Sequence, residues 1–144
     1  MFGALSADNA DMFEWKDDYS VGNGSIDGQH QKLFAIGGEL YDAMSAGQGR
    51  ASMGRILDRL VHYTAVHFAH EERLMEEYGY PGLSRHKAEH EALTKQVLAF
   101  QAELQSGRAS MTVQVLQFLK NWLERHIKVS DRAFAPCLKE KVVN

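Results

Sequence analysis

The chain is poor in cysteine and proline, and it contains no long apolar run. Cys137 is the only cysteine among 144 residues, and there are two prolines. One thiol excludes an internal disulfide and a cysteine-based zinc site, and it fits a reducing compartment. The stretch Met1–Asp18 lacks the basic and apolar regions of a secretion signal, and no later stretch approaches the length that spans a bilayer. We therefore expect a soluble, cytoplasmic protein with no membrane partner.

Neither sign of charge dominates the sequence. The 16 lysines and arginines and the 19 aspartates and glutamates are interspersed, and they leave a formal net charge of −3. No basic face therefore indicates a nucleic-acid partner, and no polybasic run indicates an anionic membrane surface. The chain also lacks a glycine-rich phosphate loop and a nucleophile elbow, so it shows no machinery for phosphoryl transfer or ordinary hydrolysis.

Glycine and proline divide the chain into an arm, four long periodic segments and a tail. The breaks fall at Gly47 and Gly49, at residues 79–82 (GYPG), and at Gly107 with Ser110. Side chains that can cap the expected helices are Ser25 or Asp27, Ser84 and Ser110. We expect an all-α single domain over residues 1–144. An N-terminal arm (1–24) precedes an up-down-up-down antiparallel four-helix bundle (about 25–130), and a short C-terminal helical tail (131–144) follows it.

Histidines interrupt the apolar stripes of the four segments. Apolar residues recur at spacings of three and four, as on the buried face of an amphipathic helix. The polar positions on these stripes are His30 in the first segment, His67 and Glu71 in the second, His86 and His90 in the third, and His126 in the fourth. Short loops bring the starts of the first and third helices to the same end as the finishes of the second and fourth. The candidates lie at that end, so we expect them to meet.

Asp131 does not fit the spacing of a regular helix. It follows His126 by five residues, which turns its side chain away from the histidine on an ideal wheel. We expect the fourth helix to end or distort between Ile127 and Asp131, so that the carboxylate returns to the cluster.

A metal centre explains the cluster better than hydrogen bonding does. Any one of these histidines alone is more often a hydrogen-bonded core residue, but five imidazoles and two carboxylates converging in one core cannot satisfy one another. Ferritin-like di-iron proteins place Glu-x-x-His on two helices, and here no glutamate stands three residues before a histidine. Imidazole and carboxylate suit iron, and they also suit manganese, cobalt and zinc.

These residues resemble the hemerythrin family, and within it the bacterial single-domain members. The resemblance rests on His30 and on three motifs: HFAHE from His67 to Glu71, HKAEH from His86 to His90, and HIKVSD from His126 to Asp131. It extends from Trp15 to the Pro136-Cys137-Leu138 tail. The Gly37-Gly38 pair departs from the family, whose members tend to carry a larger apolar residue and an asparagine there.

The resemblance implies two non-haem iron ions joined by an oxo or hydroxo bridge. By this resemblance His86, His90 and His126 bind one iron, His30 and His67 bind the other, and Glu71 and Asp131 bridge both. One coordination position then stays open on the iron held by two histidines. Dioxygen and small anions such as azide are the implied ligands, and Leu123 and Ile127 are the implied apolar wall of the ligand pocket.

Three functions remain open for such a centre. Reversible dioxygen binding, for storage or delivery, needs no further substrate. An enzyme that reduces peroxide, nitric oxide or oxygen needs an electron donor and usually a proton route, and the sequence displays neither. A sensor needs a surface that changes with the bound ligand, and with no output or membrane domain attached in this sequence it would act through a separate partner. Physiological partners and oligomeric state cannot be read from the chain.

Several other residues have plainer expected roles. His62 lies nearly opposite His67 on its helix and His70 lies on the flank, so we interpret both as surface histidines. Phe68 and Trp122 fit the apolar core, and Phe13, Trp15 and Tyr19 are expected to hold the arm on the bundle. Gly37, on the first core stripe, leaves volume that serves either a small-molecule passage or close helix packing.

Overall fold

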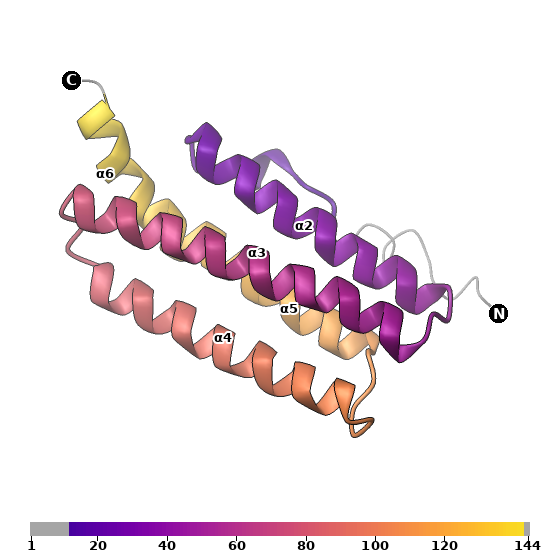
Figure 1. The fold of residues 1–144 in the computed structure, drawn as a ribbon. Coiled ribbons are helices and arrows are strands. Elements are labelled where there is room, and N and C mark those ends of the chain that lie inside the picture. The colour runs from indigo at the N-terminus through magenta and orange to yellow at the C-terminus, as the bar shows by residue number, and fades with distance from the viewer. Residues whose placement is uncertain (1–11, 143–144) are drawn as a thin grey trace.

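The computed structural model describes the backbone of residues 12–142 and the side chains of residues 12–138. The elements are η2 (Asp17–Tyr19), α2 (Gly24–Ser45), α3 (Arg50–Glu77), α4 (Leu83–Gln105), α5 (Val113–Arg125), the π-helix η3 (His126–Asp131) and α6 (Arg132–Val142). The long helices run side by side as an antiparallel four-helix bundle, and α6 continues beyond α5 (Figure 1). Helix α3 contacts both α2 and α4, and α2 also contacts α5. The predicted all-α bundle is confirmed.

The turns between the long helices fall where glycine predicted them. Gly47 follows α2 with a φ of 69°, and Gly79 follows α3 with a φ of 65°. This left-handed conformation is strained for residues with a Cβ atom and is free of that strain for glycine. The helix ends are therefore set at these positions by backbone geometry.

The cap of the first long helix differs from the expected one. Neither Ser25 nor Asp27 caps it, because α2 begins earlier and Asn23 is the residue before it. The Asn23 side chain accepts a hydrogen bond from the amide of Ile26 at 3.0 Å. The Asp27 carboxylate instead accepts from the amide of Val21 at 2.9 Å, and so it ties the arm to the first turn.

The expected caps of the other two helices are also wrong. Ser84 lies inside α4, which follows Gly82 without a side-chain cap. Ser110 lies two residues before Thr112, whose hydroxyl oxygen accepts from the amide of Val115 at 3.2 Å and caps α5. Several adjacent polar residues compete at such starts, and the choice depends on where the loop meets the bundle.

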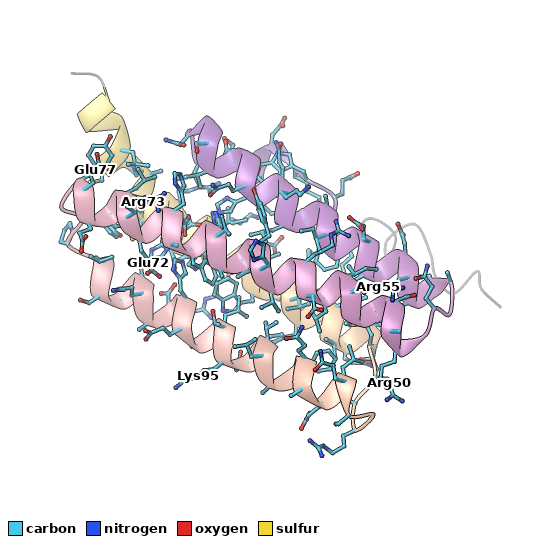
Figure 2. All side chains as sticks on the ribbon, in the orientation of Figure 1. Arg50, Arg55, Glu72, Arg73, Glu77 and Lys95 are labelled. Atoms are coloured by element: carbon cyan, nitrogen blue, oxygen red, sulfur yellow. The ribbon has the colours of Figure 1, made fainter. Side chains whose placement is uncertain are left out.

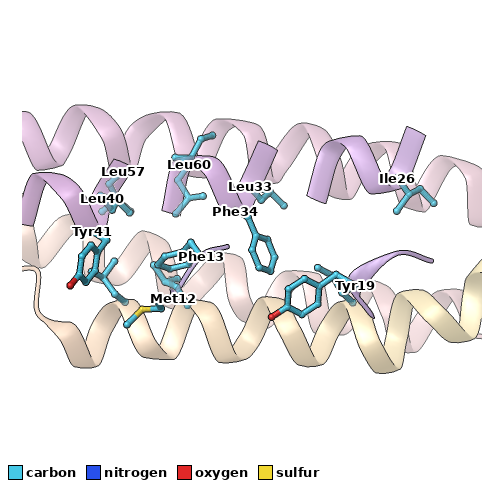
Figure 3. Packing of buried hydrophobic residues seen from close by; sticks show 14 of the residues in the cluster. Met12, Phe13, Tyr19, Ile26, Leu33, Phe34, Leu40, Tyr41, Leu57 and Leu60 are labelled. Atoms are coloured by element: carbon cyan, nitrogen blue, oxygen red, sulfur yellow. The ribbon is translucent and has the colours of Figure 1, made fainter. Parts of the chain in front are cut away.

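Aromatic side chains hold the arm on the bundle, as predicted. The Tyr19 ring lies 4.9 Å from the Phe34 ring, between ring centroids, and Trp15 and Phe13 make edge-on contacts with Phe34 at 5.7 and 6.4 Å. In Figure 3 the ring of Phe34 lies between those of Phe13 and Tyr19, and Leu33 lies beside Phe34. The arm thus adds its own apolar layer to the core.

Gly37 serves close packing by the arm. A Cβ atom at this position would lie 2.5 Å from two carbons of the Phe13 ring, so the ring rests directly on the α2 backbone. Gly37 also borders an apolar cavity of about 210 Å³ whose other lining residues include Phe68, Val97 and Leu123. Packing and cavity therefore occur together at this glycine.

The fourth helix distorts between His126 and Asp131, in the segment where the spacing of these two residues predicted a distortion. Regular α-helix ends at Arg125, and a π-helix spans His126–Asp131 before α6 resumes at Arg132. A π turn holds more residues than an α turn, so it returns a residue five positions later to the same face. The predicted distortion is confirmed, and it brings Asp131 back beside His126. Within residues 12–142, no helix combines the length and hydropathy that crossing a bilayer requires.

We expect Thr112→Ala to lower the free energy of unfolding by about 1 kcal/mol, because the Val115 amide loses its acceptor. Urea denaturation of the purified protein measures the change. Ser110→Ala is the matched control and should leave stability within about 0.5 kcal/mol, as expected for an ordinary surface substitution. A larger loss for Ser110→Ala would contradict the assigned cap.

Candidate metal centre

All seven residues that the sequence proposed as ligands lie together in the interior. Their exposed fractions range from 0 to 4%. They come from four parts of the bundle: His30 from α2, His67 and Glu71 from α3, His86 and His90 from α4, and His126 and Asp131 from η3. In Figure 2 side chains bearing nitrogen and oxygen fill the space between the helices near Glu72. The spacing argument therefore placed these residues correctly in space.

The side chains form two groups that share a carboxylate. Ligand atoms of Glu71, His86, His90 and His126 all lie within 4.8 Å of one another, and so do those of His30, His67, Glu71 and Asp131. Each group therefore has the size of a single coordination sphere, and Glu71 takes part in both.

Asp131 also reaches both groups. Its Oδ2 lies 2.8 Å from Nε2 of His30, and its Oδ1 lies 2.9 Å from Nε2 of His86. One oxygen of the carboxylate thus faces each set of histidines, and this is the arrangement of a bridging carboxylate.

The polar atoms at the centre of the cluster lack hydrogen-bond partners within the described residues. This holds for both oxygens of Glu71 and of Asp131 and for Nε2 of His30 and His67, although nitrogen–oxygen separations are short. Burying each such atom without a partner costs roughly 1–3 kcal/mol, so the whole cluster carries a cost of several kcal/mol. In the other group, Nε2 of His126 lies 3.2 Å from Nε2 of His86 and 3.1 Å from Nε2 of His90.

These nitrogens cannot satisfy one another as neutral imidazoles. A neutral imidazole carries one N–H. If that proton is on Nδ1, then Nε2 has only a lone pair, and two lone pairs cannot hydrogen-bond to each other. Lone pairs that converge from five rings and two carboxylates match the ligand preference of a transition-metal ion. The residues present therefore fit a metal centre.

Three outer side chains fix the direction of these lone pairs. Nδ1 of His67 lies 2.6 Å from Oε1 of Gln29, and Nδ1 of His90 lies 2.8 Å from Oε2 of Glu72. Nδ1 of His126 lies 3.3 Å from Oε1 of Glu89. When a metal takes the inward-facing lone pair of Nε2, each of these oxygens can accept the proton that remains on Nδ1 and so fix the orientation of the ring.

Sequence reasoning did not identify these three outer partners. Each stands directly beside a candidate ligand in the chain: Gln29 before His30, Glu72 after Glu71, and Glu89 before His90. That adjacency is the signal that would have found them, since a helical neighbour flanks the buried stripe and can reach a histidine of the next helix.

Aromatic rings pack on two of the histidines. The Phe68 ring stacks on His90 with centroids 3.7 Å apart, and the Trp122 ring stacks on His126 at 4.5 Å. Leu123 is half-buried and lines the 210 Å³ cavity, and Ile127 is fully buried in the core. The cluster is therefore bordered by apolar surface.

A second, more polar cleft approaches the cluster from outside. It has a volume of about 510 Å³, and both His86 and His126 line it. Arg85 and Arg125 also border the cleft, along with the Glu89 that contacts His126.

The two remaining histidines lie outside the cluster, as expected. His62 is exposed. His70 is half-buried, and its Nε2 lies 3.4 Å from the hydroxyl of the exposed Ser25.

Opposite charges within the cluster shift the pKa values of its histidines and carboxylates. Burial by itself lowers the pKa of His30 and of His126, but contacts with Asp131 and Glu71 outweigh it and raise these values to about 9 and about 10. Burial and the neighbouring Glu71 raise the pKa of Asp131, but His126 and His30 outweigh both and lower it to about 2. The pKa of Glu71 is likewise held well below its usual range by the surrounding histidines against the effect of burial. Without a metal, protons on the histidines balance the carboxylates.

Comparison with known proteins agrees with this arrangement. The family model described as the Hemerythrin HHE cation binding domain matches residues 21–138. A bacteriohemerythrin of Stenotrophomonas maltophilia is 38% identical over 89% of this chain and 82% of its own. One of Methylococcus capsulatus is 32% identical over 84% of this chain and 92% of its own. A crystal structure of wild-type hemerythrin superimposes with a TM-score of 0.80 at 32% identity, covering 86% of this chain and 95% of the other.

Fold and site together define an antiparallel four-helix bundle that carries a buried non-haem metal centre. The chain belongs to the hemerythrin family. Membership supports metal-based binding of dioxygen, and the His, Glu and Asp cluster supplies the ligands that such binding needs.

We expect the melting temperature of the metal-free protein to fall as pH rises from 6.5 toward 10. A histidine whose pKa is raised by folding stabilises the native state fully below its unfolded value of 6.5, and this contribution is lost as pH passes the folded values of about 9 and 10. Thermal unfolding followed by circular dichroism measures the trend.

Asp131→Asn is the matched control for this trend. It removes the charge that holds the protons on His30 and His126, so its melting temperature should depend less on pH over this range. A wild-type melting temperature that stays constant or rises between pH 6.5 and 10 would contradict the internal ion pairs.

Proposed function

We propose that the whole chain, residues 1–144, is a single hemerythrin-like domain that binds dioxygen reversibly at a di-iron centre. His86, His90 and His126 hold one iron, His30 and His67 hold the other, and Glu71 and Asp131 bridge them together with an oxo or hydroxo group. The proposal rests on the observation that two groups of ligands, each compact enough to coordinate one metal ion, share Glu71, while Asp131 faces both. A single metal would leave one of these groups unsatisfied.

The unequal numbers of histidines support a single open position. The side with three histidines is more fully coordinated by protein than the side with His30 and His67. Bound iron supplies electrons to a small ligand such as dioxygen, and azide is the expected inhibitory ligand at the same position. The protein supplies fixed imidazole directions, two buried negative charges and an apolar border.

The apolar border has its own task in reversible binding. Leu123 and Phe68 line the same cavity next to the cluster, and Ile127 is fully buried. A dry surrounding limits the access of water and protons to the site, and both would favour irreversible oxidation of the metal over release of intact oxygen.

An anaerobic optical titration with oxygen, followed by its removal, tests the proposal. Iron analysis should give two irons per chain, and the spectrum should return to the starting state when the oxygen pressure falls. Repeated cycles should consume no reductant. Rapid turnover of oxygen, peroxide or nitric oxide with an added electron donor, and no return to the starting spectrum, would instead establish the enzyme alternative.

His86→Ala should reduce iron affinity by at least 10-fold and lower the melting temperature of the iron-loaded protein. The substitution removes a ligand and leaves the remaining buried groups without their metal. Iron analysis and thermal unfolding measure the two effects. His62→Ala is the matched control on an exposed site and should change neither; two irons and a normal oxygen spectrum in His86→Ala would refute the ligand assignment.

Leu123→Asn should accelerate conversion of the oxygenated protein to the diferric form by several-fold, with the iron count retained. The amide places a polar group beside the proposed open position and favours entry of water. The absorbance decay under oxygen measures the rate. Leu98→Asn makes the same change at an exposed residue of the cavity rim and should have little effect; equal decay rates in wild type and Leu123→Asn would remove the assigned role of the wall.

A further inference from the structure

The outer partners of the histidines differ between the two halves of the cluster. On the side with three histidines, His90 and His126 face the carboxylates of Glu72 and Glu89 at 2.8 and 3.3 Å. On the side with two, His67 faces the neutral amide oxygen of Gln29 at 2.6 Å. Nδ1 of His30 has no hydrogen-bond partner among residues 12–142.

The identity of the Gln29 atom that faces His67 follows from the cluster itself. Nε2 of His67 points inward among the other candidate ligands, 3.4 Å from Oε2 of Glu71, so a metal bound in the cluster takes the Nε2 lone pair and the ring proton then resides on Nδ1. Nδ1 then donates, and only the carbonyl oxygen of Gln29 can accept. The contact is short, and it involves no charged group.

A carboxylate and an amide affect a metal-bound imidazole differently. A carboxylate draws the Nδ1 proton toward itself, which gives the ring more imidazolate character and makes Nε2 a stronger electron donor. A stronger donor stabilises the oxidised state of the metal. A neutral amide orients the ring equally well but adds much less electron density.

We infer that Gln29 is a positioning residue that keeps the metal on the two-histidine side more easily reduced than its neighbour, through a neutral hydrogen bond to His67. Among the residues that the structure describes, two outer carboxylates contact histidines on one side and none does on the other, so the halves are electronically unequal. The inference rests on the proposed function, which places the open position on the side of His30 and His67.

The inequality has a direct consequence for ligand release. Dioxygen departs intact only when the electrons return to the metals, and a weaker donor set at the open position favours that return. Gln29 therefore shifts the equilibrium toward release, whereas a glutamate at this position would favour retention.

The test compares Gln29→Glu with wild type by spectroelectrochemistry of the iron-loaded protein. Reduction of the diferric form takes its electrons from the electrode, and no covalent bond within the protein changes. Gln29→Glu should lower the midpoint potential by about 59 mV, the equivalent of a tenfold change for a one-electron step. Oxygen release should slow by a similar factor.

Two further variants separate this effect from a general effect of charge. Gln31→Glu adds the same charge at an exposed position of α2 and should leave the potential near the wild-type value. Glu72→Gln exchanges the carboxylate for an amide on the other side and should raise the potential. If Gln29→Glu fails to fold, an unchanged potential in Glu72→Gln overturns the inference by itself.

A readout that does not depend on oxygen binding comes from the zinc-loaded protein. Nitrogen NMR of His67 should show an Nδ1 proton in wild type and a shift toward imidazolate character in Gln29→Glu. If that shift occurs while the potential stays at the wild-type value, the inference is overturned. Loss of reversible oxygen binding in wild type would instead overturn the proposed function, and the NMR result would still report the hydrogen bond.

Discussion

The structure depends on the burial of two carboxylates, Glu71 and Asp131, among five imidazoles. Buried charges of one sign are costly unless opposite charge lies next to them, supplied here by protons on histidine or by a metal. All four long segments, with η3 as the continuation of α5, contribute a polar group to this compensation. Loss of the compensating charge therefore weakens the packing of one whole end of the bundle, so fold and site form a single energetic unit.

Much of this arrangement follows from spacing alone. Helical periodicity and short loops confine His30, His86 and His126 to one end and one face, because rise and rotation per residue are constant in a helix. The same constancy required a distortion before Asp131, and the π-helix provides it. These features were predictable because they depend on backbone geometry, which is insensitive to the rest of the chain.

Features that depend on competition or on distant contacts were not predictable. Asn23 rather than Ser25 caps α2. The helix begins earlier than expected, and the Asp27 carboxylate accepts a hydrogen bond from the arm instead of capping the helix. The contact of Phe13 with Gly37 joins segments that no periodicity relates. The partnership of Gln29 with His67 crosses two helices, and many polar residues flank the buried stripes, so only the tertiary arrangement selects among them.

The π-helix limits how the length of one segment can change. Between Ile127 and Asp131, Val129 is 61% exposed, whereas Lys128 pairs with Asp18 and Ser130 donates a hydrogen bond to Glu89. Removing one residue there would place the aspartate four residues after His126, on the same face of a regular α-helix, whereas adding one would place it six residues after His126, about 120° away. Divergence of this chain can therefore proceed by substitution at Val129, or by a deletion that closes the π turn into an α turn, whereas a one-residue insertion would turn the Asp131 carboxylate away from the cluster.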